Sequence, residues 1–372
     1  MKKVAIFITS LRGGGAERIV SYLLKEGYEK FELHLILLHK DIEYEIPGEG
    51  SIKIFELEGA KASKFSSIFK MKSLSEKLRN YLEENKIDTV ISLLNRPNLI
   101  ACRVKKSGWE GKLIISERAD TLAYYKTIRF GWYMIRLVRK YYPYADEVTV
   151  ISKGIARSLA KLGIKKSHVI YNPIYNSGLD VPVITARPFT FINIARLEPQ
   201  KNQALLLKAF AKVADKNCYL VILGKGLLLD DLKDLAIELS ITDRVNFEGF
   251  QSNIKSYLLQ SDCFVFSSDY EGLGNVIIEA LQAGLPVIST DCPYGPREIL
   301  SPESDTDTLM KKGVDLAAYG ILTPVGNEEY LAEAMQKIIE NSVLRNKYRE
   351  LSKPRALDFD INKIAKKYFD LF

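Results

Sequence analysis

The feature that most constrains this chain is a series of short apolar runs that alternates with helical segments and then begins again. The first series of runs comprises residues 4–9, 33–38, 89–93, 112–116, 147–151 and 168–171, with helical segments that include 16–28 and 74–85. The second series comprises 189–194, 219–223, 245–248, 263–267, 287–290 and 320–323, with helical segments at 203–214, 228–239, 254–261 and 276–283. Alternation of this kind predicts an α/β fold of parallel sheets with helices on both faces.

The length of the chain and one proline-containing stretch indicate two domains. A chain of 372 residues is longer than a typical single core. Between the two series, residues 172–178 and the prolines that follow them have the composition of a linker. We therefore expect an N-terminal domain over residues 1–175, a linker over 176–188 and a C-terminal domain over 189–354. An amphipathic C-terminal helix within 355–372 is expected to pack on the first domain, although either domain could accommodate it.

Composition narrows the class of protein further. The contents of 47% hydrophobic and 27% charged residues are those of a globular protein, and no stretch approaches the ~18 apolar residues of a membrane span. The apolar start leads into Arg12 and glycines rather than a cleavage site, which predicts a first buried strand of a cytoplasmic protein. The four cysteines form no zinc pattern and are expected to be reduced thiols. A net charge of +7 suits an anionic partner.

The first candidate site is a glycine cluster, Gly13-Gly14-Gly15, which follows the first expected strand and opens a helix. Glycines let the backbone approach a ligand, and a helix N-terminus offers N–H groups to an anion. The dinucleotide fingerprint fails because Arg18 occupies the place of its third glycine. A tight turn and a phosphate loop fit this cluster equally well.

Two further candidates lie in the second series. Arg196 and Lys201 follow its first strand and could clamp a diphosphate, although exposed surface cations are the alternative. The segment from Glu271 to Glu279 follows the strand at 263–267 and opens an apolar helix, whose glycine-rich start would offer amides to a diphosphate. A carboxylate within an apolar helix needs a hydrogen-bonding partner, and a ribose diol would provide one for Glu279. The alternative is a charge on the helix surface.

Together these elements resemble the family-four glycosyltransferases of GT-B fold, and the resemblance covers nearly the whole chain. Residues 291–300 also resemble the segment that follows the glutamate motif in many bacterial members. The resemblance implies two facing, doubly wound, Rossmann-like domains with a deep cleft between them. It also implies a nucleotide-sugar donor, no cofactor, no metal and retention of anomeric configuration. The retaining reaction is expected to be a front-face substitution in which an oxygen of the leaving phosphate takes the acceptor proton.

The resemblance also implies roles for individual residues. Arg196 and Lys201 would bind the donor diphosphate, Glu279 the ribose hydroxyls and Glu271 the hydroxyls of the transferred sugar. Backbone amides would complete the phosphate cradle, and these belong to Gly272, Leu273, Gly274 and Asn275, with Gly14 and Gly15 from the first domain. Gly224 and Phe250 lie in loops that resemble those flanking the nucleotide base.

One departure from the family concerns a histidine that many members carry after a strand of the N-terminal domain. None of His34, His39 and His168 is expected at that place. The matching segment contains Glu117 and Arg118, either of which could point at the sugar. Glu117 could act as a base or form a structural ion pair, and both interpretations remain open. The pair Asp305 and Asp307 has the spacing of a metal motif but lies in a polar loop, so we expect it to be solvated.

The acceptor side of the protein is predicted from two basic, aromatic segments, 61–79 and 124–144. The first carries six cations against Glu76, and the second carries five cations and no acid. Such segments suit the edge of an anionic bilayer or a pocket for a polyprenyl diphosphate, while a helix packed on the core is the alternative. A nucleic-acid partner has no supporting motif. We expect peripheral attachment to the inner face of the cell membrane.

A narrower resemblance suggests the substrates. Residues 1–38, 44–47 and 94–98 look like those of N-acetylgalactosaminyltransferases that extend undecaprenyl-diphosphate glycans. UDP-N-acetylgalactosamine is therefore the expected donor and a polyprenyl-diphosphate-linked glycan the expected acceptor. UDP-N-acetylglucosamine, another hexose donor of capsule or O-antigen synthesis, and a non-catalytic sugar-nucleotide-binding subunit are alternatives. A GT-B epimerase or phosphorylase would share the architecture.

Overall fold

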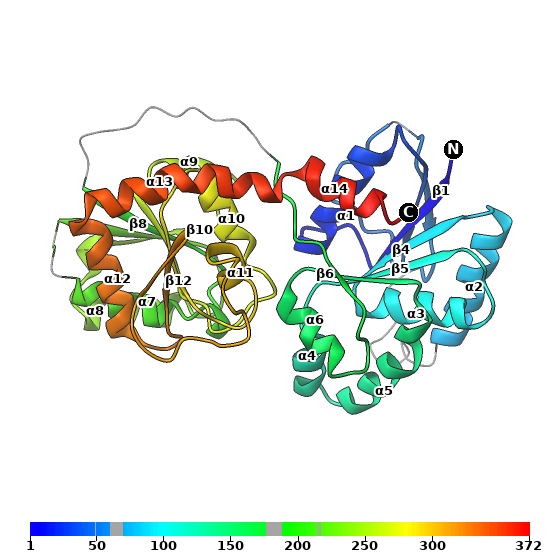
Figure 1. Cartoon of the computed structure of the whole chain (residues 1–372), viewed down its shortest axis with the longest axis horizontal. Coiled ribbons are helices and arrows are strands. Elements are labelled where there is room, and N and C mark those ends of the chain that lie inside the picture. The colour runs from blue at the N-terminus through cyan, green and yellow to red at the C-terminus, as the bar shows by residue number, and fades with distance from the viewer. Residues whose placement is uncertain (49, 60–69, 176–187, 214, 216) are drawn as a thin grey trace. The chain divides into compact units, whose positions relative to one another are not determined.

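The computed structural model describes residues 1–48, 50–59, 70–175, 188–213, 215 and 217–372 (Figure 1). Residues 61–69 of the first basic segment, and all of the expected linker except Pro188, lie outside the described residues. The chain divides into two compact units. Unit 1 comprises Met1–Pro173 with Ile361–Phe372, and unit 2 comprises Ile174–Asp360.

Within the described residues, unit 1 contains a seven-stranded sheet in the order β3-β2-β1-β4-β5-β6-β7, and all of its strand pairs are parallel. The strands are β1 (Lys3–Ile8), β2 (Glu32–Leu37), β3 (Lys53–Glu56), β4 (Thr89–Leu93), β5 (Lys112–Glu117), β6 (Glu147–Val150) and β7 (His168–Val169). The helices are α1 (Gly15–Gly27), α2 (Met71–Glu84), α3 (Asn95–Lys106), α4 (Thr121–Thr127), α5 (Gly131–Tyr141), α6 (Lys153–Ala160) and α14 (Ile361–Phe369). The chain starts in the middle of the sheet, and the direction of winding reverses between β1 and β4.

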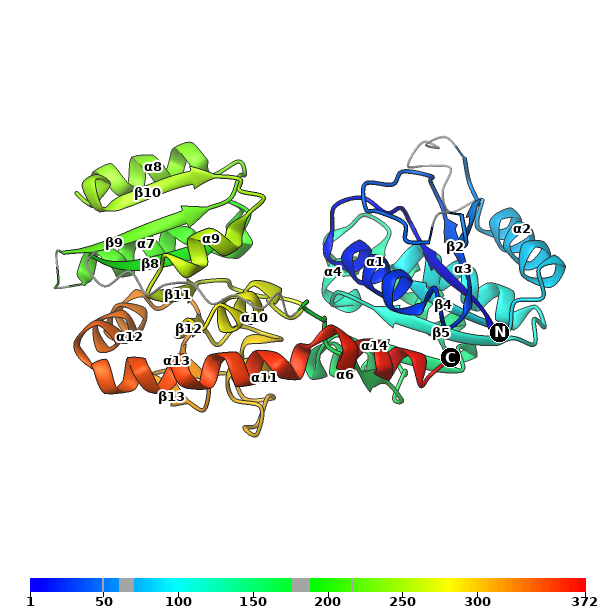
Figure 2. The same cartoon turned by 90° about the horizontal axis from the view of Figure 1, so that it is seen from above.

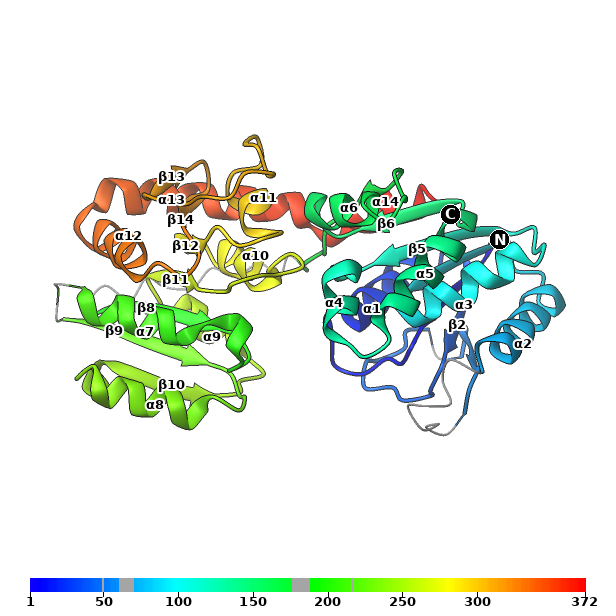
Figure 3. The same ribbon diagram turned by 90° about the horizontal axis from the view of Figure 1, so that it is seen from below.

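In the described part of unit 2 there is a second seven-stranded sheet in the order β10-β9-β8-β11-β12-β14-β13, which is parallel except for the pair β13 and β14. Its strands are β8 (Phe189–Ile194), β9 (Cys218–Leu223), β10 (Val245–Gly249), β11 (Cys263–Phe266), β12 (Val287–Thr290), β13 (Asp315–Ala317) and β14 (Gly320–Thr323). Its helices are α7 (Gln203–Lys212), α8 (Leu229–Glu238), α9 (Ile254–Leu259), α10 (Asn275–Gln282), α11 (Pro296–Leu300), α12 (Glu328–Glu340) and α13 (Ser342–Ala356). Figures 2 and 3 show helices on both faces of each sheet.

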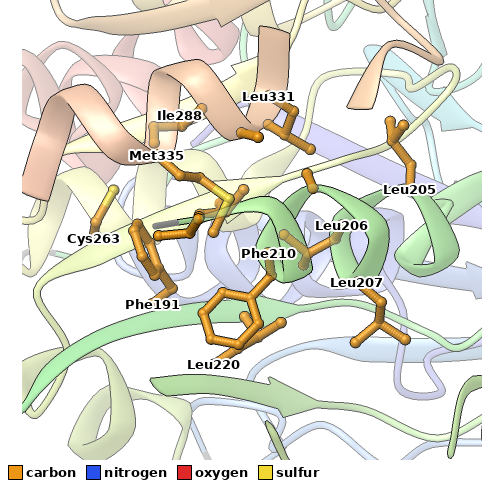
Figure 4. Close-up of a cluster of buried hydrophobic side chains, with 14 of the residues drawn as sticks. Phe191, Leu205, Leu206, Leu207, Phe210, Leu220, Cys263, Ile288, Leu331 and Met335 are labelled. Atoms are coloured by element: carbon orange, nitrogen blue, oxygen red, sulfur yellow. The ribbon is translucent and has the colours of Figure 1, made fainter. Parts of the chain in front are cut away.

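Burial on both faces explains why the strands were visible in the sequence as apolar runs. In β1, β2 and β5, every residue after the first is buried. Because helices cover both sides of such a strand, it reads as a continuous apolar run and not as an alternating pattern. In unit 2 the packing centres on Phe191 of β8 and Phe210 of α7, whose ring centroids are 6.3 Å apart, with Met335 of α12 in the same cluster (Figure 4).

The strands missed by the sequence analysis are edge strands. β3 reads Lys-Ile-Phe-Glu, and none of its four residues is buried. β13 pairs only with β14 and is likewise short. An edge strand has a neighbour on one side only, so it needs no long apolar run, and its pattern is weak in a sequence.

Helix α14 belongs to unit 1 although it follows all of unit 2 in the chain. Its Phe369 ring lies 5.3 Å from the ring of Phe31, and Tyr368 is fully buried. Arg118, directly after β5, donates a hydrogen bond from Nη1 to the Tyr368 hydroxyl at 2.9 Å. A second guanidinium nitrogen of Arg118 donates to Asn172 Oδ1. These contacts fix the C-terminal helix on the sheet of unit 1.

Replacing Tyr368 tests how much this packing stabilises unit 1. We expect Tyr368→Ala to lower the free energy of unfolding of unit 1 by about 3–5 kcal/mol, because it leaves a cavity. Tyr368→Phe should cost about 1–3 kcal/mol, through loss of the acceptor for Arg118. Hydrogen exchange of unit 1 amides in urea measures both changes. Tyr124→Ala, at a tyrosine that is 53% exposed, is the control. Equal effects of Tyr368→Ala and Tyr124→Ala would contradict the proposed contribution of Tyr368 to the stability of unit 1.

Candidate active site

The loops after β8 and β11 are fastened together where these two neighbouring strands end. Ser267 Oγ donates to the carbonyl of Lys201 at 2.9 Å, and the Asp269 N–H donates to the carbonyl of Gln200 at 2.9 Å. Asn202 Nδ2 donates to Asp269 Oδ1 at 2.8 Å. We call the side of a sheet at which its parallel strands end its carboxyl edge. Ligands of open α/β sheets bind outside this edge.

At the carboxyl edge of unit 2, Lys201 and Glu271 form an ion pair. Lys201 Nζ lies 2.5 Å from Glu271 Oε1, and the two side chains are only 15% and 10% exposed. The ammonium also lies 5.7 Å from the centroid of the Phe266 ring. Arg196 differs, because its side chain is 67% exposed and pairs with Glu198 at 2.8 Å. The edge therefore carries two cations that are each paired with a carboxylate, and of the two only Arg196 is largely exposed to solvent.

The glycine-rich start of the glutamate motif forms the N-terminus of α10. Gly274 precedes the helix with a left-handed φ of 85°, and no side chain caps the helix. Leu273 is buried, so its side chain belongs to the core and only its backbone can face a ligand. Glu279 lies one turn further along the helix and is partly buried. The amides of Gly272 to Asn275 thus have the arrangement that binds anions at helix N-termini.

The loop after β12 supports this motif. The Glu271 N–H donates to the carbonyl of Pro293 at 3.1 Å. Gly295 has a φ of 94°, and a Cβ at this position would lie 2.0 Å from the carbonyl oxygen of Leu273. Only glycine fits so close to the motif's backbone. Gly295 thus lets the loop after β12 pack directly against the backbone of the glutamate motif.

A buried ion pair holds that loop, and the sequence analysis did not find it. Asp291 has no exposed surface and accepts two hydrogen bonds from Arg297, at 2.9 Å from Nε and 2.7 Å from Nη2. The Met310 N–H donates to Asp291 Oδ2 at 2.7 Å. A bidentate arginine–carboxylate pair fixes the geometry of both partners. The only sequence signal was an aspartate at the end of a strand with an arginine six residues later.

Gly224 and Phe250 lie in loops after β9 and β10. Gly224 has a φ of 145°, and a Cβ there would lie 1.8 Å from the carbonyl oxygen of Ala195, so this loop packs on the one after β8. Phe250 is 66% exposed, and Lys225 Nζ lies 5.1 Å from its ring centroid. An exposed ring with a cation beside it is a surface on which a planar group can stack.

The glycine cluster in unit 1 contacts the loop after β2. The Gly13 N–H donates to Glu43 Oε2 at 2.9 Å, and the Tyr44 hydroxyl donates to the carbonyl of Gly14 at 3.3 Å. Helix α1 follows, with Gly14 as its N-cap and no side-chain cap. Gly14 and Gly15 thus lie at a helix N-terminus on the carboxyl edge of unit 1, a position that both a phosphate loop and a tight turn can occupy.

Glu117 is placed differently from what either sequence interpretation expected. Its side chain has no exposed surface. Oε1 accepts from Asn98 Nδ2 at 2.9 Å and from the Tyr142 hydroxyl, and Oε2 accepts from Thr121 Oγ1 at 2.6 Å. These three partners are neutral. Burial raises the pKa of Glu117, and these hydrogen bonds and the charge of Arg118 offset part of that rise.

Two further expectations concern metals and membranes. The described residues contain no group of three or more His, Cys, Asp or Glu side chains that could hold a metal ion. Asp305 accepts hydrogen bonds from the Asp307 N–H at 2.8 Å and from Thr308 Oγ1 at 2.9 Å, which are contacts within its own turn. Among the helices of the described part of the chain, none is long and apolar enough to cross a membrane.

The fold and this edge define a glycosyltransferase of GT-B architecture, and comparisons with known proteins agree. The model for "Glycosyl transferases group 1" matches residues 180–355, and the model for "Glycosyltransferase Family 4" matches residues 13–176. Among solved structures, Anabaena HepE in complex with UDP has a TM-score of 0.79 at 18% identity and covers 100% of this chain and 99% of its own. The lipopolysaccharide outer core galactosyltransferase WaaB has a TM-score of 0.78 at 21% identity, with the same coverage.

Two curated relatives come from Campylobacter jejuni. One is the N-acetylgalactosamine-N,N'-diacetylbacillosaminyl-diphospho-undecaprenol 4-alpha-N-acetylgalactosaminyltransferase, 33% identical over 98% of each chain. The other is a GalNAc-alpha-(1->4)-GalNAc-alpha-(1->3)-diNAcBac-PP-undecaprenol alpha-1,4-N-acetyl-D-galactosaminyltransferase, 27% identical over 100% of this chain and 98% of its own. The chain therefore belongs to the family-four glycosyltransferases, and the expected family, fold class and enzyme class are confirmed.

Glu117→Gln tests the buried carboxyl. Because its pKa is raised above the ordinary 4.5, the folded state holds a proton that the unfolded state releases between the two pKa values. The free energy of unfolding should therefore fall as pH rises through this interval and not change below it. Glu117→Gln should remove this part of the slope, measured by denaturation from about pH 4 to pH 8. An unchanged slope would contradict the prediction. A catalytic base would also cost about 10²–10⁴-fold in turnover on mutation, whereas we expect a smaller loss.

Proposed function

We propose that this glycosyltransferase moves N-acetylgalactosamine from UDP-N-acetylgalactosamine to a hydroxyl of a polyprenyl-diphosphate-linked glycan. The observation that carries the donor half is the Lys201–Glu271 pair beside the uncapped N-terminus of α10. The acceptor half rests on the functions named for the two Campylobacter jejuni relatives. UDP as the nucleotide is supported by its presence in the HepE complex.

In the proposed donor complex, each group at the carboxyl edge of unit 2 has one task. Arg196 and Lys201 neutralise the diphosphate, together with the amides at the start of α10. Glu279 accepts hydrogen bonds from the ribose hydroxyls, and Glu271 accepts them from the transferred sugar. Lys201 Nζ has three N–H donors, so it can keep its bond to Glu271 while donating to a phosphate oxygen. The pair therefore links recognition of the diphosphate to the position of the sugar-binding carboxylate.

The proposed reaction retains configuration and uses no metal to bind the donor. As the bond between the anomeric carbon and the phosphate oxygen breaks, the acceptor oxygen bonds to the same face of that carbon. The acceptor proton passes to the leaving phosphate oxygen, so no protein nucleophile or protein base takes part. Fixed cations and amides stabilise the charge that develops on the departing UDP. A fully buried Glu117 is compatible with this scheme, because the scheme requires no residue of unit 1 to transfer a proton.

The acceptor is proposed to be presented at a membrane by the segment 124–144. Helix α5 buries Leu137, Val138 and Tyr141 on one face. Packing on the core, the alternative interpretation of this segment, therefore explains that face but not the exposed one. Trp132 on the other face is 63% exposed, and a shallow hollow of about 680 Å³ is lined by Trp132, Tyr133, Arg136, Leu137, Arg139 and Lys140. Aromatic rings among cations suit the interface of an anionic bilayer. We propose peripheral attachment to the inner face of the cell membrane.

Thermal unfolding with nucleotides tests the donor site. We expect UDP and UDP-N-acetylgalactosamine to raise the melting temperature, because a ligand of the folded state adds about 2.7 kcal/mol at a hundredfold excess over its Kd. GDP, ADP and UDP-N-acetylglucosamine should give smaller shifts, and EDTA should change none of them. Glu279→Ala should abolish the shift, whereas Glu238→Ala on α8 should keep it. Equal shifts in both variants would contradict the assigned role of Glu279, and loss of the UDP shift in EDTA would contradict metal-independent binding.

Co-sedimentation with vesicles tests the membrane surface. We expect binding to phosphatidylglycerol vesicles at low salt and weaker binding as salt rises, because screening shortens the range of surface charges. Replacing Arg136, Arg139 and Lys140 by alanine should weaken binding by about 1 kcal/mol for each cation. The control replaces Lys311, Lys312 and Lys347 of unit 2, which removes the same charge. Equal losses would indicate attraction by net charge alone, and absence of binding by the native chain would overturn the proposed attachment.

A further inference from the structure

A second cluster of paired charges lies at the carboxyl edge of unit 1 and has no task in the scheme above. Glu58 follows β3, and Arg96 is the second residue of α3, which follows β4. Arg96 Nη1 lies 2.8 Å from Glu58 Oε2, and Nη2 donates to Oε1 at 2.9 Å. His39, after β2, has its Nε2 3.7 Å from the same carboxylate. Two loops and the first turn of α3 thus contribute one side chain each.

The topology places this cluster over the middle of the sheet. In the strand order, β2 and β1 lie between β3 and β4. Neighbouring strands are about 4.8 Å apart, so a direct contact between groups that follow β3 and β4 has to reach across the ends of β2 and β1. The winding reverses between β1 and β4, and such switch points are where open α/β sheets bind ligands. The Glu58–Arg96 pair therefore lies where a ligand of unit 1 is expected.

The local backbone and the burial of Glu58 hold the pair in one geometry. The Glu58 side chain is 2% exposed, whereas that of Arg96 is 31% exposed. Leu94, at the junction of β4 and α3, has φ 75° and ψ 153°, a region that side chains rarely adopt. Strain of this kind persists only where surrounding contacts impose it. The buried carboxylate of Glu58 thus orients the guanidinium of Arg96, and solvent reaches the guanidinium rather than the carboxylate.

The charges of the cluster select the class of ligand. A guanidinium has five N–H donors, and the hydrogen bond from Nη2 to Glu58 Oε1 uses one of them. Glu58 offsets the charge of the one arginine in this cluster, whereas the carboxyl edge of unit 2 gathers two cations, Arg196 and Lys201, for a diphosphate, so we assign the remaining donors of Arg96 to neutral oxygens. The cations of α5, by contrast, have no acid within residues 124–144 and suit phosphate. We propose that Arg96, oriented by Glu58 and His39, binds hydroxyl or acetamido oxygens of the acceptor's sugar. This inference rests on the proposed function, because it supplies that function's acceptor with a sugar site.

The kinetic test compares Arg96→Lys with Arg79→Gln. Lysine keeps the charge beside Glu58 but lacks the planar fork, so the fold is retained while sugar contacts are lost. We expect the acceptor KM to rise about tenfold or more, since hydrogen bonds to charged groups contribute about 1.5–3 kcal/mol. The donor KM and the UDP melting shift should not change. Arg79, in an exposed pair with Glu83 on α2, should affect neither constant. An unchanged acceptor KM in a folded Arg96→Lys variant would overturn the inference.

A binding test does not depend on turnover. Saturation-transfer NMR with methyl α-N-acetylgalactosaminide reports sugar contact directly. We expect part of its signal to be lost in Arg96→Gln but retained in Glu271→Gln, whose site would bind the donor's sugar. Inorganic pyrophosphate binding should be the same in Arg96→Gln and the native chain. Two results in Arg96→Gln would overturn the inference. One is an undiminished sugar signal, and the other is loss of pyrophosphate binding with the sugar signal retained. If UDP fails to bind the native chain, the proposed function fails while this test still decides the role of Arg96.

Discussion

The parallel arrangement of strands is the constraint on which the rest of the structure depends. Because neighbouring parallel strands end at the same side, residues that are 70 positions apart in the chain, such as Lys201 and Glu271, lie 2.5 Å apart. The same arrangement places the uncapped start of α10 beside them. A helix N-terminus attracts anions only weakly by itself. The attraction becomes specific for a bound anion when cations and amides lie together at one edge, and the parallel sheet places them there.

Charged side chains at the two carboxyl edges are held in pairs, and these pairs fix the loops that carry them. Burying a charge is costly unless it is paired and hydrogen-bonded, and a buried pair contributes little net stability. The pairs Lys201–Glu271, Asp291–Arg297 and Glu58–Arg96 are therefore better explained by the geometry that they impose on their loops. Glu117 shows the other solution, since neutral donors surround it and its pKa is raised by burial.

The sequence was sufficient for features that depend on local pattern. Central strands have apolar runs because both faces are buried, and the segment from Glu271 to Glu279 combines glycines, a helix start and two carboxylates within one stretch. Edge strand β3 has no such run and was missed. Side-chain partners were also missed, because no local pattern tells that Arg118 donates to Tyr368, 250 residues later. The burial of Glu117 likewise depends on three separate helical elements, which supply Asn98, Thr121 and Tyr142.

The difference in charge between the two carboxyl edges follows from the chemistry that we assign to them. A departing nucleoside diphosphate develops negative charge, so the edge that binds it needs more than one cation, and Arg196 and Lys201 supply two, each beside a carboxylate. A sugar hydroxyl carries no charge, and an unpaired cation beside it would attract the donor's phosphates to the wrong place. Glu58 neutralises Arg96 and so removes that competition. If the leaving phosphate takes the acceptor proton, unit 1 has only to position the acceptor, and oriented hydrogen-bond donors are sufficient for that task.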